Sequence, residues 1–315
     1  MRIVFMGTPD FSVGTLRALA EAGHQIVGVV SQPDKPRGRG KALAPTPVKE
    51  EALRLGLPVY QPARVREEGF VQTLRELEPD VIVVVAFGQI IPESILSLAP
   101  LGCINVHASL LPSYRGAAPI QWAVINGEEK SGVTIMRMDA GLDTGDMISR
   151  VEVPLSEEET GGSLFDKLSQ AGARLLVETL PTLADGTAVY EKQPSESPTD
   201  YAGMIRKEMG NLDWSMPAVK LERLIRGLNP WPSAYTFLGG KTLKLWRARV
   251  EQSQSEASCG TVLSAGKGGL LVQTGDGALR ILELQLEGKK RMDAEAFLRG
   301  YQIPAGTVLS GKRQE

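Results

Sequence analysis

Asn105 and His107 stand two residues apart in the stretch GCINVHASLLPSYRGAAP, which covers residues 102–119. The chain contains only two histidines, so the placement of one in this stretch needs an explanation. The run CINVH predicts a strand, and side chains two residues apart on a strand point to the same face. Ligands of open α/β sheets bind beyond the carboxyl ends of the strands. The pair therefore favours a functional role over a histidine that is merely satisfied by a neighbouring hydrogen bond.

The glycine-rich segment DAGLDTGDM (139–147) holds three aspartates, Asp139, Asp143 and Asp146. The segment follows the next predicted strand, so one of these carboxylates could hold the His107 imidazole in one tautomer and stabilise its charged form. Aspartates in tight loops also cap turns. We expect the capping role for Asp139 and Asp146.

Other kinds of site fit these residues less well. Asp143 opens an Asp-Thr-Gly triplet of the aspartic-protease type, but only one copy occurs, in a sheet of another class. Ser109 does not stand on a Gly-x-Ser-x-Gly turn. His107 has no second histidine at a metal-ligand spacing, so no metal is expected. The first strand–helix turn, MGTPDFSVG (6–14), lacks the Gly-x-Gly-x-x-Gly pattern of dinucleotide sites.

The elements that position these residues belong to an α/β pattern. Short apolar runs rich in β-branched residues alternate with helical patterns, which predicts a Rossmann-like open parallel sheet covered on both faces. Strands are expected at 2–7, 25–31, 57–62, 81–88, 102–109 and 132–139, and helices at 11–23, 47–56, 69–80 and 161–184.

The pattern changes after a stretch rich in Pro, Ser, Glu and Thr at 190–200. One helix at 217–230 is followed by short alternating strands separated by glycine-rich turns, which predict a small antiparallel β-barrel. We therefore expect a catalytic domain over 1–188, a linker over 189–205 and a C-terminal, OB-like barrel domain over 206–315.

Charge is unevenly distributed along the chain. Residues 1–204 hold 18 Lys and Arg against 26 Asp and Glu, whereas residues 205–315 hold 17 against 11. A basic half is a hint of a polyanionic partner. With two cysteines, no signal-peptide pattern and no long apolar run, the composition predicts a reduced, cytoplasmic protein that does not enter a membrane.

The segment QPDKPRGRGKALAPTPVK (32–49) is a second basic feature. Loops longer than about 12–15 residues inside compact domains are usually functional. Its basic side chains favour phosphate contacts, and hence a nucleic acid or a phosphorylated substrate. They are Lys35, Arg37, Arg39, Lys41 and Lys49.

Six segments in order resemble a known family. They are MGTPDFS, QPDKPRGRGK with PTPVK, VAFGQIIP, GCINVHASLLPSYRGAAPIQWAVINGE, GVTIMRMDAGLDTGDM and NPWPSAY. The core Asn-x-His-x-Ser-Leu-Leu-Pro, followed by Asp-x-Gly-x-Asp-Thr-Gly, resembles the 10-formyltetrahydrofolate-dependent formyltransferases over essentially the whole chain. The RGRGK loop, NPWPSA and the basic C-terminal half are similar to the tRNA-directed members.

This resemblance implies a reaction and its partners. The formyl group of 10-formyltetrahydrofolate would move to the α-amino group of methionine on initiator methionyl-tRNA, for translation initiation and without a metal. By the family pattern, Asn105 would donate to the oxyanion and Asp143 would pair with His107. His107 would act either as a hydrogen-bond donor to the oxyanion or in proton transfer from nitrogen, and the sequence leaves these two roles open.

The resemblance also implies binding residues. The folate would lie along two segments, Phe87, Gly88, Gln89, Ile90, Ile91 and Pro92, and Ser109, Leu110, Leu111 and Pro112. Basic side chains would contact tRNA: Lys35, Arg37, Arg39 and Lys41 in the loop, and Lys207, Arg223, Arg226, Lys244 and Arg247 in the C-terminal domain.

Three alternatives remain at this point. A sibling formyltransferase acting on a small amine, such as glycinamide ribonucleotide or an amino-sugar nucleotide, would share Asn105, His107 and Asp143 but would have no use for a basic barrel. A non-catalytic tRNA-binding module and a nicotinamide-dependent dehydrogenase are more distant. We expect a monomer.

Overall fold

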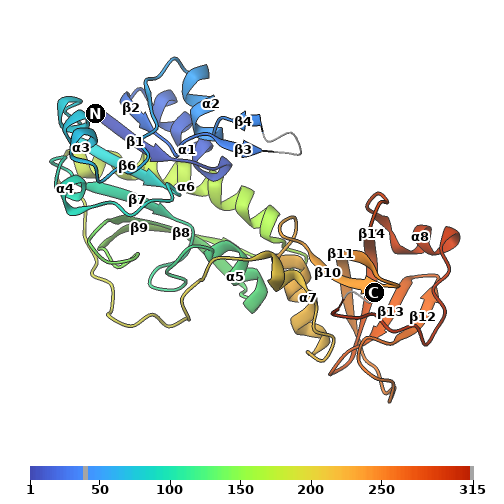
Figure 1. The fold of residues 1–315 in the computed structure, drawn as a ribbon. Helices are drawn as coiled ribbons and strands as arrows, with labels where there is room; N and C mark the ends of the chain where they lie inside the picture. The colour runs from blue at the N-terminus through green and yellow to red at the C-terminus, as the bar shows by residue number, and fades with distance from the viewer. Residues whose placement is uncertain (38–41, 313–315) are drawn as a thin grey trace. The chain divides into compact units, whose positions relative to one another are not determined.

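A computed structural model describes residues 1–37 and 42–312, which form two compact units (Figure 1). The first unit comprises Met1–Pro119, Lys130–Pro154 and Phe165–Ala202. The second comprises Ile120–Glu129, Leu155–Leu164 and the chain from Gly203 onward. No helix of the described residues is long and apolar enough to cross a membrane.

A seven-stranded sheet forms the centre of the first unit, in the order β5-β2-β1-β6-β7-β8-β9. Its strands are β1 (Arg2–Gly7), β2 (Gln25–Val30), β5 (Val59–Tyr60), β6 (Val81–Val85), β7 (Cys103–His107), β8 (Lys130–Arg137) and β9 (Met147–Pro154). The first five in this order pair in parallel, as expected from their apolar, β-branched sequences. The α/β class is therefore confirmed.

The last two strands differ from the all-parallel sheet that the alternation predicted. β8 pairs antiparallel with β7, and β9 pairs antiparallel with β8. The segment between β7 and β8 therefore stays at the end of the sheet where β7 finishes, and β8 runs back toward the start of β7. This mixed edge carries the loop with Asp143.

Helices cover both faces of this sheet (Figure 1). They are α1 (Asp10–Glu21), α2 (Pro47–Arg54), α3 (Glu68–Glu76), α4 (Glu93–Leu96) and α6 (Gly161–Ala184). On one face, Phe11 of α1 meets Phe165 of α6 edge to face, with ring centroids 5.3 Å apart. On the other face, Leu74 of α3 and Ile95 of α4 join the core made by alternate residues of β1 and β6.

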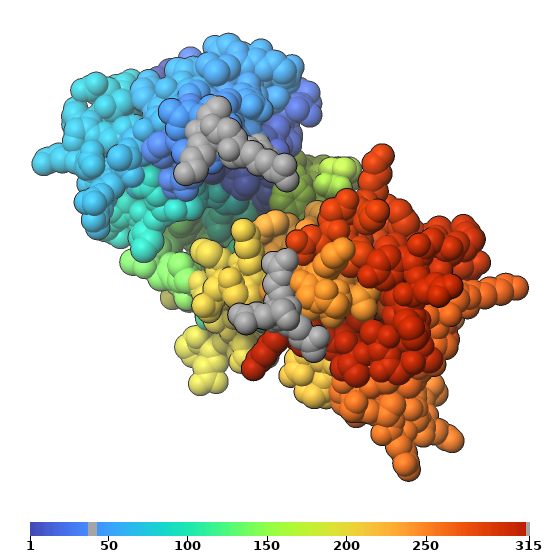
Figure 2. All heavy atoms as spheres, turned by 45° about the vertical axis from the view of Figure 1, so that its right-hand side comes forward, coloured from blue at the N-terminus to red at the C-terminus, as the bar shows by residue number. Residues whose placement is uncertain are grey.

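The basic segment 32–49 contains two short paired strands at the surface of the first unit (Figure 2). Its strands are β3 (Lys35–Arg37) and β4 (Ala42–Ala44). Lys35 is exposed. Arg39 and Lys41 lie outside the described residues, and so does the side chain of Arg37.

The second unit is built on a six-stranded antiparallel sheet. Its strands are β10 (Ala234–Leu238), β11 (Lys241–Glu251), β12 (Val262–Gly266), β13 (Gly269–Gln273), β14 (Ala278–Leu286) and β15 (Met292–Asp293). The segment around 308–310 bridges β12 on one side and β10 on the other, and so closes the sheet toward the expected barrel. Around it lie η1 (Lys207–Gly210), α7 (Ala218–Gly227) and α8 (Ala294–Gly300).

Two segments from the predicted catalytic domain over 1–188 pack in the second unit. They are 120–129, which contains most of α5 (Pro119–Asn126), and 155–164, which contains the first turn of α6. Gly227 of α7 contacts Ile125 of α5, and the Gly162 N–H donates to the Asn229 carbonyl at 2.8 Å. The predicted boundaries at 188 and 206 separate the domains along the sequence. These two segments precede residue 188, yet they pack in the second unit.

Candidate active site

Strand β7 places Asn105 and His107 on one face of the sheet. Alternation along the strand puts them on the side of Cys103, which belongs to the core formed with α3 and α4. Asn105 lies opposite Val84 of β6 on one side and Met136 of β8 on the other. The two side chains are 9% and 6% exposed, so the sheet shields them from bulk water.

His107 uses its two ring nitrogens differently. Nε2 lies 3.0 Å from the carbonyl oxygen of Tyr114, and Nδ1 lies 3.6 Å from Oδ1 of Asp143. A carbonyl oxygen can only accept, so Nε2 carries a proton and donates. Nδ1 is therefore the ring nitrogen that can accept or release a proton, and it faces the aspartate.

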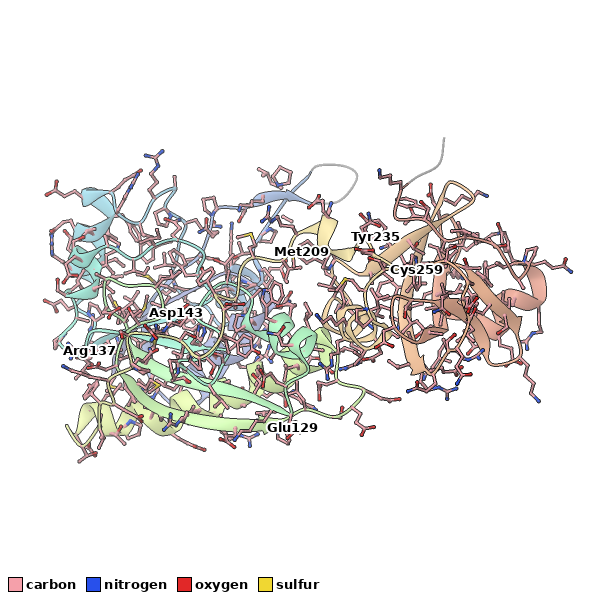
Figure 3. All side chains as sticks on the ribbon, turned by 90° about the horizontal axis from the view of Figure 1, so that it is seen from below. Glu129, Arg137, Asp143, Met209, Tyr235 and Cys259 are labelled. Atoms are coloured by element: carbon pink, nitrogen blue, oxygen red, sulfur yellow. The ribbon has the colours of Figure 1, made fainter. Side chains whose placement is uncertain are left out.

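The Asp143 carboxylate reaches this place from the far end of the sheet. Thr134 of β8 pairs with His107, whereas Arg137, the last residue of β8, pairs with Ile104. At about 3.4 Å per residue the loop after β8 begins about 10 Å from His107. Residues 139–146, the Asp143 loop, lead back, and Asp143 lies among the packed side chains of the first unit (Figure 3).

Two sets of hydrogen bonds shape the Asp143 loop. Within it, Asp139 Oδ1 accepts from the Gly141 N–H at 3.0 Å and from the Thr144 hydroxyl at 2.7 Å, which confirms its capping role. Across to the loop after β7, the Gly116 N–H donates to Asp143 Oδ2 at 2.9 Å. One carboxylate oxygen is thus held by the backbone while the other faces the imidazole.

The carboxamide of Asn105 has no hydrogen-bond partner within the described part of the chain. Its amide atoms are not among the enclosed polar atoms that lack a partner in the described residues, which are Oδ1 of Asn211 and Nε1 of Trp246, so the amide keeps contact with solvent. A ligand oxygen at this position would replace solvent as the acceptor for the amide hydrogens. Asn105, His107 and Asp143 therefore form a site with one unpaired donor, one imidazole and one carboxylate.

Sequence reasoning missed residues 190–202, which we call the strap. The composition of this stretch predicted a linker, yet its residues hold the site loops by side-chain hydrogen bonds. Thr199 Oγ1 accepts from the Tyr114 N–H at 2.7 Å, and the Ser197 hydroxyl donates to the Pro112 carbonyl at 2.8 Å. Gln193 and Arg115 link the strap to the Asp143 loop. No local sequence signal distinguishes these polar residues from those of a solvated linker.

The two predicted folate segments follow adjacent parallel strands, β6 and β7. Phe87 and Leu111 are buried in core clusters, so their side chains support the fold. Ile90 is 87% exposed. Thr134 fixes the second segment, because its hydroxyl donates to the Ser109 carbonyl at 2.7 Å and accepts from the Leu111 N–H at 3.1 Å. Both segments remain a prediction as a folate site.

The predicted tRNA-contacting residues of the second unit differ in their surroundings. Lys207 and Arg247 are exposed. Arg226 is instead tied to Glu222 and donates to the Glu159 carbonyl at 2.8 Å. Arg223 donates to the Asn126 carbonyl at 3.3 Å, and the Lys244 ammonium lies 5.6 Å from the centre of the Trp246 ring.

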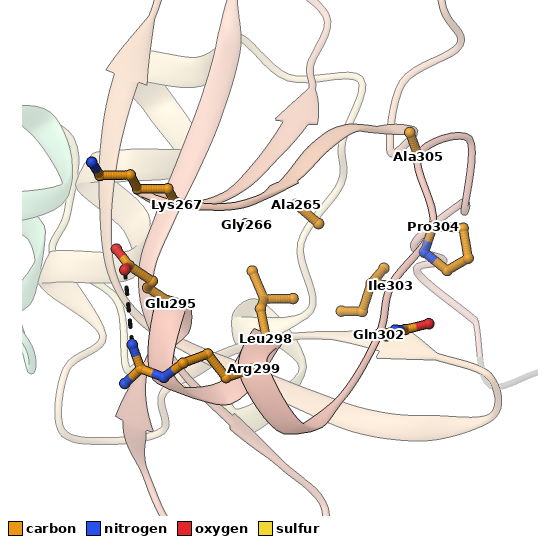
Figure 4. Close-up of a pocket in the computed structure, with 10 residues that line it drawn as sticks. All are labelled: Ala265, Gly266, Lys267, Glu295, Leu298, Arg299, Gln302, Ile303, Pro304 and Ala305. Carbon is orange, nitrogen blue, oxygen red and sulfur yellow. Dashed lines mark ion pairs between the residues drawn. The ribbon is translucent and has the colours of Figure 1, made fainter.

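Two further features lie apart from Asn105, His107 and Asp143. Burial raises the pKa of the Cys103 thiol to about 12, which excludes a reactive thiolate there. A cavity of about 580 Å³ in the second unit is lined by Leu298 and Ile303, with the Glu295–Arg299 ion pair at its rim (Figure 4). Among the described residues, no group of three His, Cys, Asp or Glu side chains could hold a metal ion.

Comparison with known proteins gives two family matches and close relatives. Residues 1–180 match the formyl transferase family and residues 204–302 match its C-terminal domain. The methionyl-tRNA formyltransferase of Agathobacter rectalis is 59% identical over 310 residues, which cover 98% of this chain and 100% of that protein. That of Bacillus licheniformis is 53% identical over 309 residues, with 98% of each chain covered.

Solved structures agree on the fold at lower identity. HypX from Aquifex aeolicus in complex with tetrahydrofolic acid is 19% identical with a TM-score of 0.60, over 95% of this chain and 47% of that one. The present chain thus spans about half the length of HypX. WlaRD, a sugar 3N-formyl transferase, is 17% identical with a TM-score of 0.63, over 92% and 99% of the two chains.

Proposed function

The chain belongs to the formyl transferase family, and we propose that it transfers the formyl group of 10-formyltetrahydrofolate to the α-amino group of methionine on initiator methionyl-tRNA. Relatives with this printed activity are 50–59% identical over nearly the full chain. The alternative, a small-amine formyltransferase, is not favoured, because the neighbours of that kind are below 25% identical.

One observation carries the assignment of the site: the carboxamide of Asn105, which has no partner among the described residues and keeps contact with solvent, stands on the same strand face as His107. When the amine attacks the formyl carbon, negative charge develops on the formyl oxygen. The Asn105 NH₂ group donates to that oxygen. Removing one such donor typically costs about 10²–10³ in rate.

His107 and Asp143 act on the proton that the attacking nitrogen must lose. Nε2 of His107 stays bonded to the Tyr114 carbonyl, so Nδ1 exchanges the proton. The Asp143 carboxylate, 3.6 Å from Nδ1, stabilises the imidazolium that forms. The proton then passes to the departing N10 nitrogen of the folate, and the released products are tetrahydrofolate and formylmethionyl-tRNA.

The folate and tRNA assignments extend this proposal to binding. The segments 87–92 and 109–112 flank the catalytic strand at the carboxyl ends of β6 and β7, where open α/β sheets bind ligands. Basic residues of the surface hairpin and of the barrel supply phosphate contacts. We infer a cytoplasmic protein, because charged tRNA is a cytoplasmic substrate. The expected monomer remains a prediction, and sedimentation of the purified protein tests it.

The proposal is tested with purified protein, 10-formyltetrahydrofolate, and methionyl-tRNA of the initiator and elongator kinds. We expect formylmethionine on the initiator, and a kcat about 10²–10³ lower for Asn105→Ala with KM for the tRNA little changed. Asn126→Ala is the matched control in the second unit. A wild-type protein that forms no formylmethionine would overturn the function, whereas an unimpaired Asn105→Ala would overturn the site.

A further inference from the structure

We propose that Gln193, in the strap, is a positioning residue for formyl transfer: it fixes the backbone of the Asp143 loop so that the Asp143 carboxylate faces His107. This inference rests on the proposed function. It assigns a catalytic contribution to a residue 50 positions along the chain from Asp143, in a stretch whose composition indicates only a linker.

The Gln193 carboxamide forms hydrogen bonds to the loops that carry Asp143 and Arg115. Its Nε2 donates to the Asp143 carbonyl at 2.9 Å and to the Gly145 carbonyl at 2.7 Å. Its Oε1 accepts from Nε and Nη2 of Arg115 at 3.0 Å and 2.9 Å. Two donor hydrogens and two acceptor lone pairs are all a carboxamide has, so this side chain has one orientation in which every group is satisfied.

Arg115 fixes Gln193 in turn. Its guanidinium also donates to the Pro194 carbonyl at 2.7 Å and to the Ser195 carbonyl at 3.2 Å. Together with the bonds to Gln193, it therefore binds three consecutive residues of the strap. The backbone of Arg115 is also paired with the strap, since the Ala202 N–H donates to its carbonyl at 2.8 Å. The acceptor side of Gln193 is therefore anchored.

These contacts close a ring around the catalytic carboxylate. Arg115 is followed by Gly116, whose N–H donates to Asp143 Oδ2, while the Asp143 carbonyl accepts from Gln193, which accepts from Arg115. The ring holds Asp143 at two points, its side chain and its backbone. Two fixed points define the direction of the Oδ1 atom that faces His107, whereas one would leave it free to turn.

The Asp143 loop needs this external support because the hydrogen bonds within the loop do not fix the direction of the Asp143 carboxylate. Asp139 ties only residues of the loop to one another. The loop leaves β8 opposite Ile104 and must return about 10 Å to reach His107. Asp143 itself has a φ of 54°, a conformation that non-glycine residues rarely adopt and that surrounding structure must impose.

The consequence for catalysis lies in kcat. A misplacement of about 1 Å in a catalytic group can cost on the order of 10²-fold in rate. Gln193 itself is assigned no contact with either substrate, so binding should change little. Loss of its hydrogen bonds should therefore lower kcat and leave both KM values close to those of the wild type.

The experiment replaces Gln193 by methionine, which is similar in size and cannot form these hydrogen bonds. With initiator methionyl-tRNA and 10-formyltetrahydrofolate, we expect Gln193→Met to lower kcat by about 10-fold to 100-fold, with less than about a threefold change in either KM. Ser195→Ala is the matched control, because Ser195 contributes only its backbone carbonyl to Arg115. It should retain wild-type kcat.

A double-mutant cycle separates positioning from general destabilisation. If Gln193 acts through Asp143, Gln193→Met should cost almost nothing further in an Asp143→Asn background. Gln193→Glu is the second variant, since it keeps the Arg115 pair but turns a carboxylate oxygen toward two carbonyls. Thermal unfolding of each variant establishes that it is folded at the assay temperature.

Each outcome decides one claim. Three outcomes would overturn the positioning role: unchanged kcat in both Gln193→Met and Gln193→Glu, an effect on KM alone, or additive losses of kcat with Asp143→Asn. With an active wild type, none of them would affect the proposed function. An inactive wild type would overturn the proposed function first. An unimpaired Asp143→Asn would remove the role of Asp143 on which this inference depends.

Discussion

At the scale of residues, the site combines one unsatisfied group with two satisfied ones. His107 and Asp143 have fixed partners, Tyr114 and Gly116, that set their direction. Asn105 has none within the described residues, although it is almost fully buried. The Asn105 amide keeps contact with solvent, so it is available to donate to a ligand oxygen on the strand face that it shares with His107.

Glu51 shows the opposite use of a buried polar group, as a structural tie between α1 and α2. Arg54 and Arg17 donate to its carboxylate at 2.6–2.9 Å and lower its pKa from 4.5 to about 2. A carboxyl whose pKa is lower in the folded state stabilises the protein above its unfolded pKa. That stabilisation is lost as the pH falls from 4.5 toward 2.

We predict from this that Glu51→Gln is less stable than the wild type at pH 7, and that the difference in free energy of unfolding shrinks as the pH falls from about 5 to 3. Urea unfolding of both proteins at each pH measures this difference in free energy. Glu50→Gln, an exposed neighbour in the same helix, is the control for the change of charge. A constant difference across this range would contradict the tie.

At the scale of elements, the antiparallel hairpin of β8 and β9 decides how the site is assembled. In a fully parallel sheet, β8 would end at the same end of the sheet as β7, and the Asp143 loop would follow it directly beside His107. The observed direction of β8 sends the loop out at the other end and makes it fold back along the strand. The close packing of this returning loop against β8 leaves no room at Gly145.

A prediction for this loop follows from Gly145. A Cβ atom there would lie 1.8 Å from the Arg137 carbonyl oxygen, so backbone must move to admit it. We expect Gly145→Ala to cost about 1–3 kcal/mol of stability. Because the displaced loop carries Asp143, kcat should also fall on the order of 10-fold or more.

Gly69→Ala is the control for Gly145→Ala, because a Cβ at this helical glycine meets nothing within 4 Å. Thermal unfolding and steady-state kinetics report the two effects separately. Wild-type kcat in a folded Gly145→Ala protein would show that the loop tolerates the shift, and would weaken the link between loop position and rate.

At the scale of the whole molecule, the uneven charge matches the proposed polyanionic substrate. The basic excess lies in residues 205–315, and the exposed lysines and arginines there include Lys207 and Arg247. Paired arginines instead hold segments of the second unit together: Arg226 donates to the Glu159 carbonyl, and Arg280 of β14 pairs with Glu251 of β11. Only some of the basic residues are therefore available to phosphates.

Salt dependence tests this reading of charge. Phosphate contacts release counterions, so we predict that KM for methionyl-tRNA rises on the order of 10-fold between 50 and 200 mM KCl, while KM for the folate changes much less. Lys207→Ala should reduce the slope of log KM against log salt by about 1. Lys130→Ala, which removes a lysine paired with Glu152 in the first unit, should not. Equal salt dependence for both substrates would contradict the charge argument.

Much of the fold follows from local pattern. Continuous β-branched runs can be buried on both faces only in a covered sheet, and the helix at 161–184 has the bounds that its periodicity predicts. The Gly-Gly turn after 238 adopts positive φ at both positions, which suits the hairpin expected there. The direction of β8 was mispredicted, because a strand's sequence records its burial and not the direction of its neighbour.

The sequence by itself determined the types and local geometry of the residues proposed as catalytic: a period of two places Asn105 and His107 on one face, and the family pattern singles out Asp143. Tertiary structure alone decided that Nε2 of His107 is occupied by Tyr114, that Asn105 has no partner in the described chain, and that Gln193 and Arg115 hold the Asp143 loop. The reason is physical. A strand's periodicity is fixed by its own backbone, whereas these contacts join residues far apart in sequence, and nothing in the local chemistry of a glutamine or an arginine names its partner.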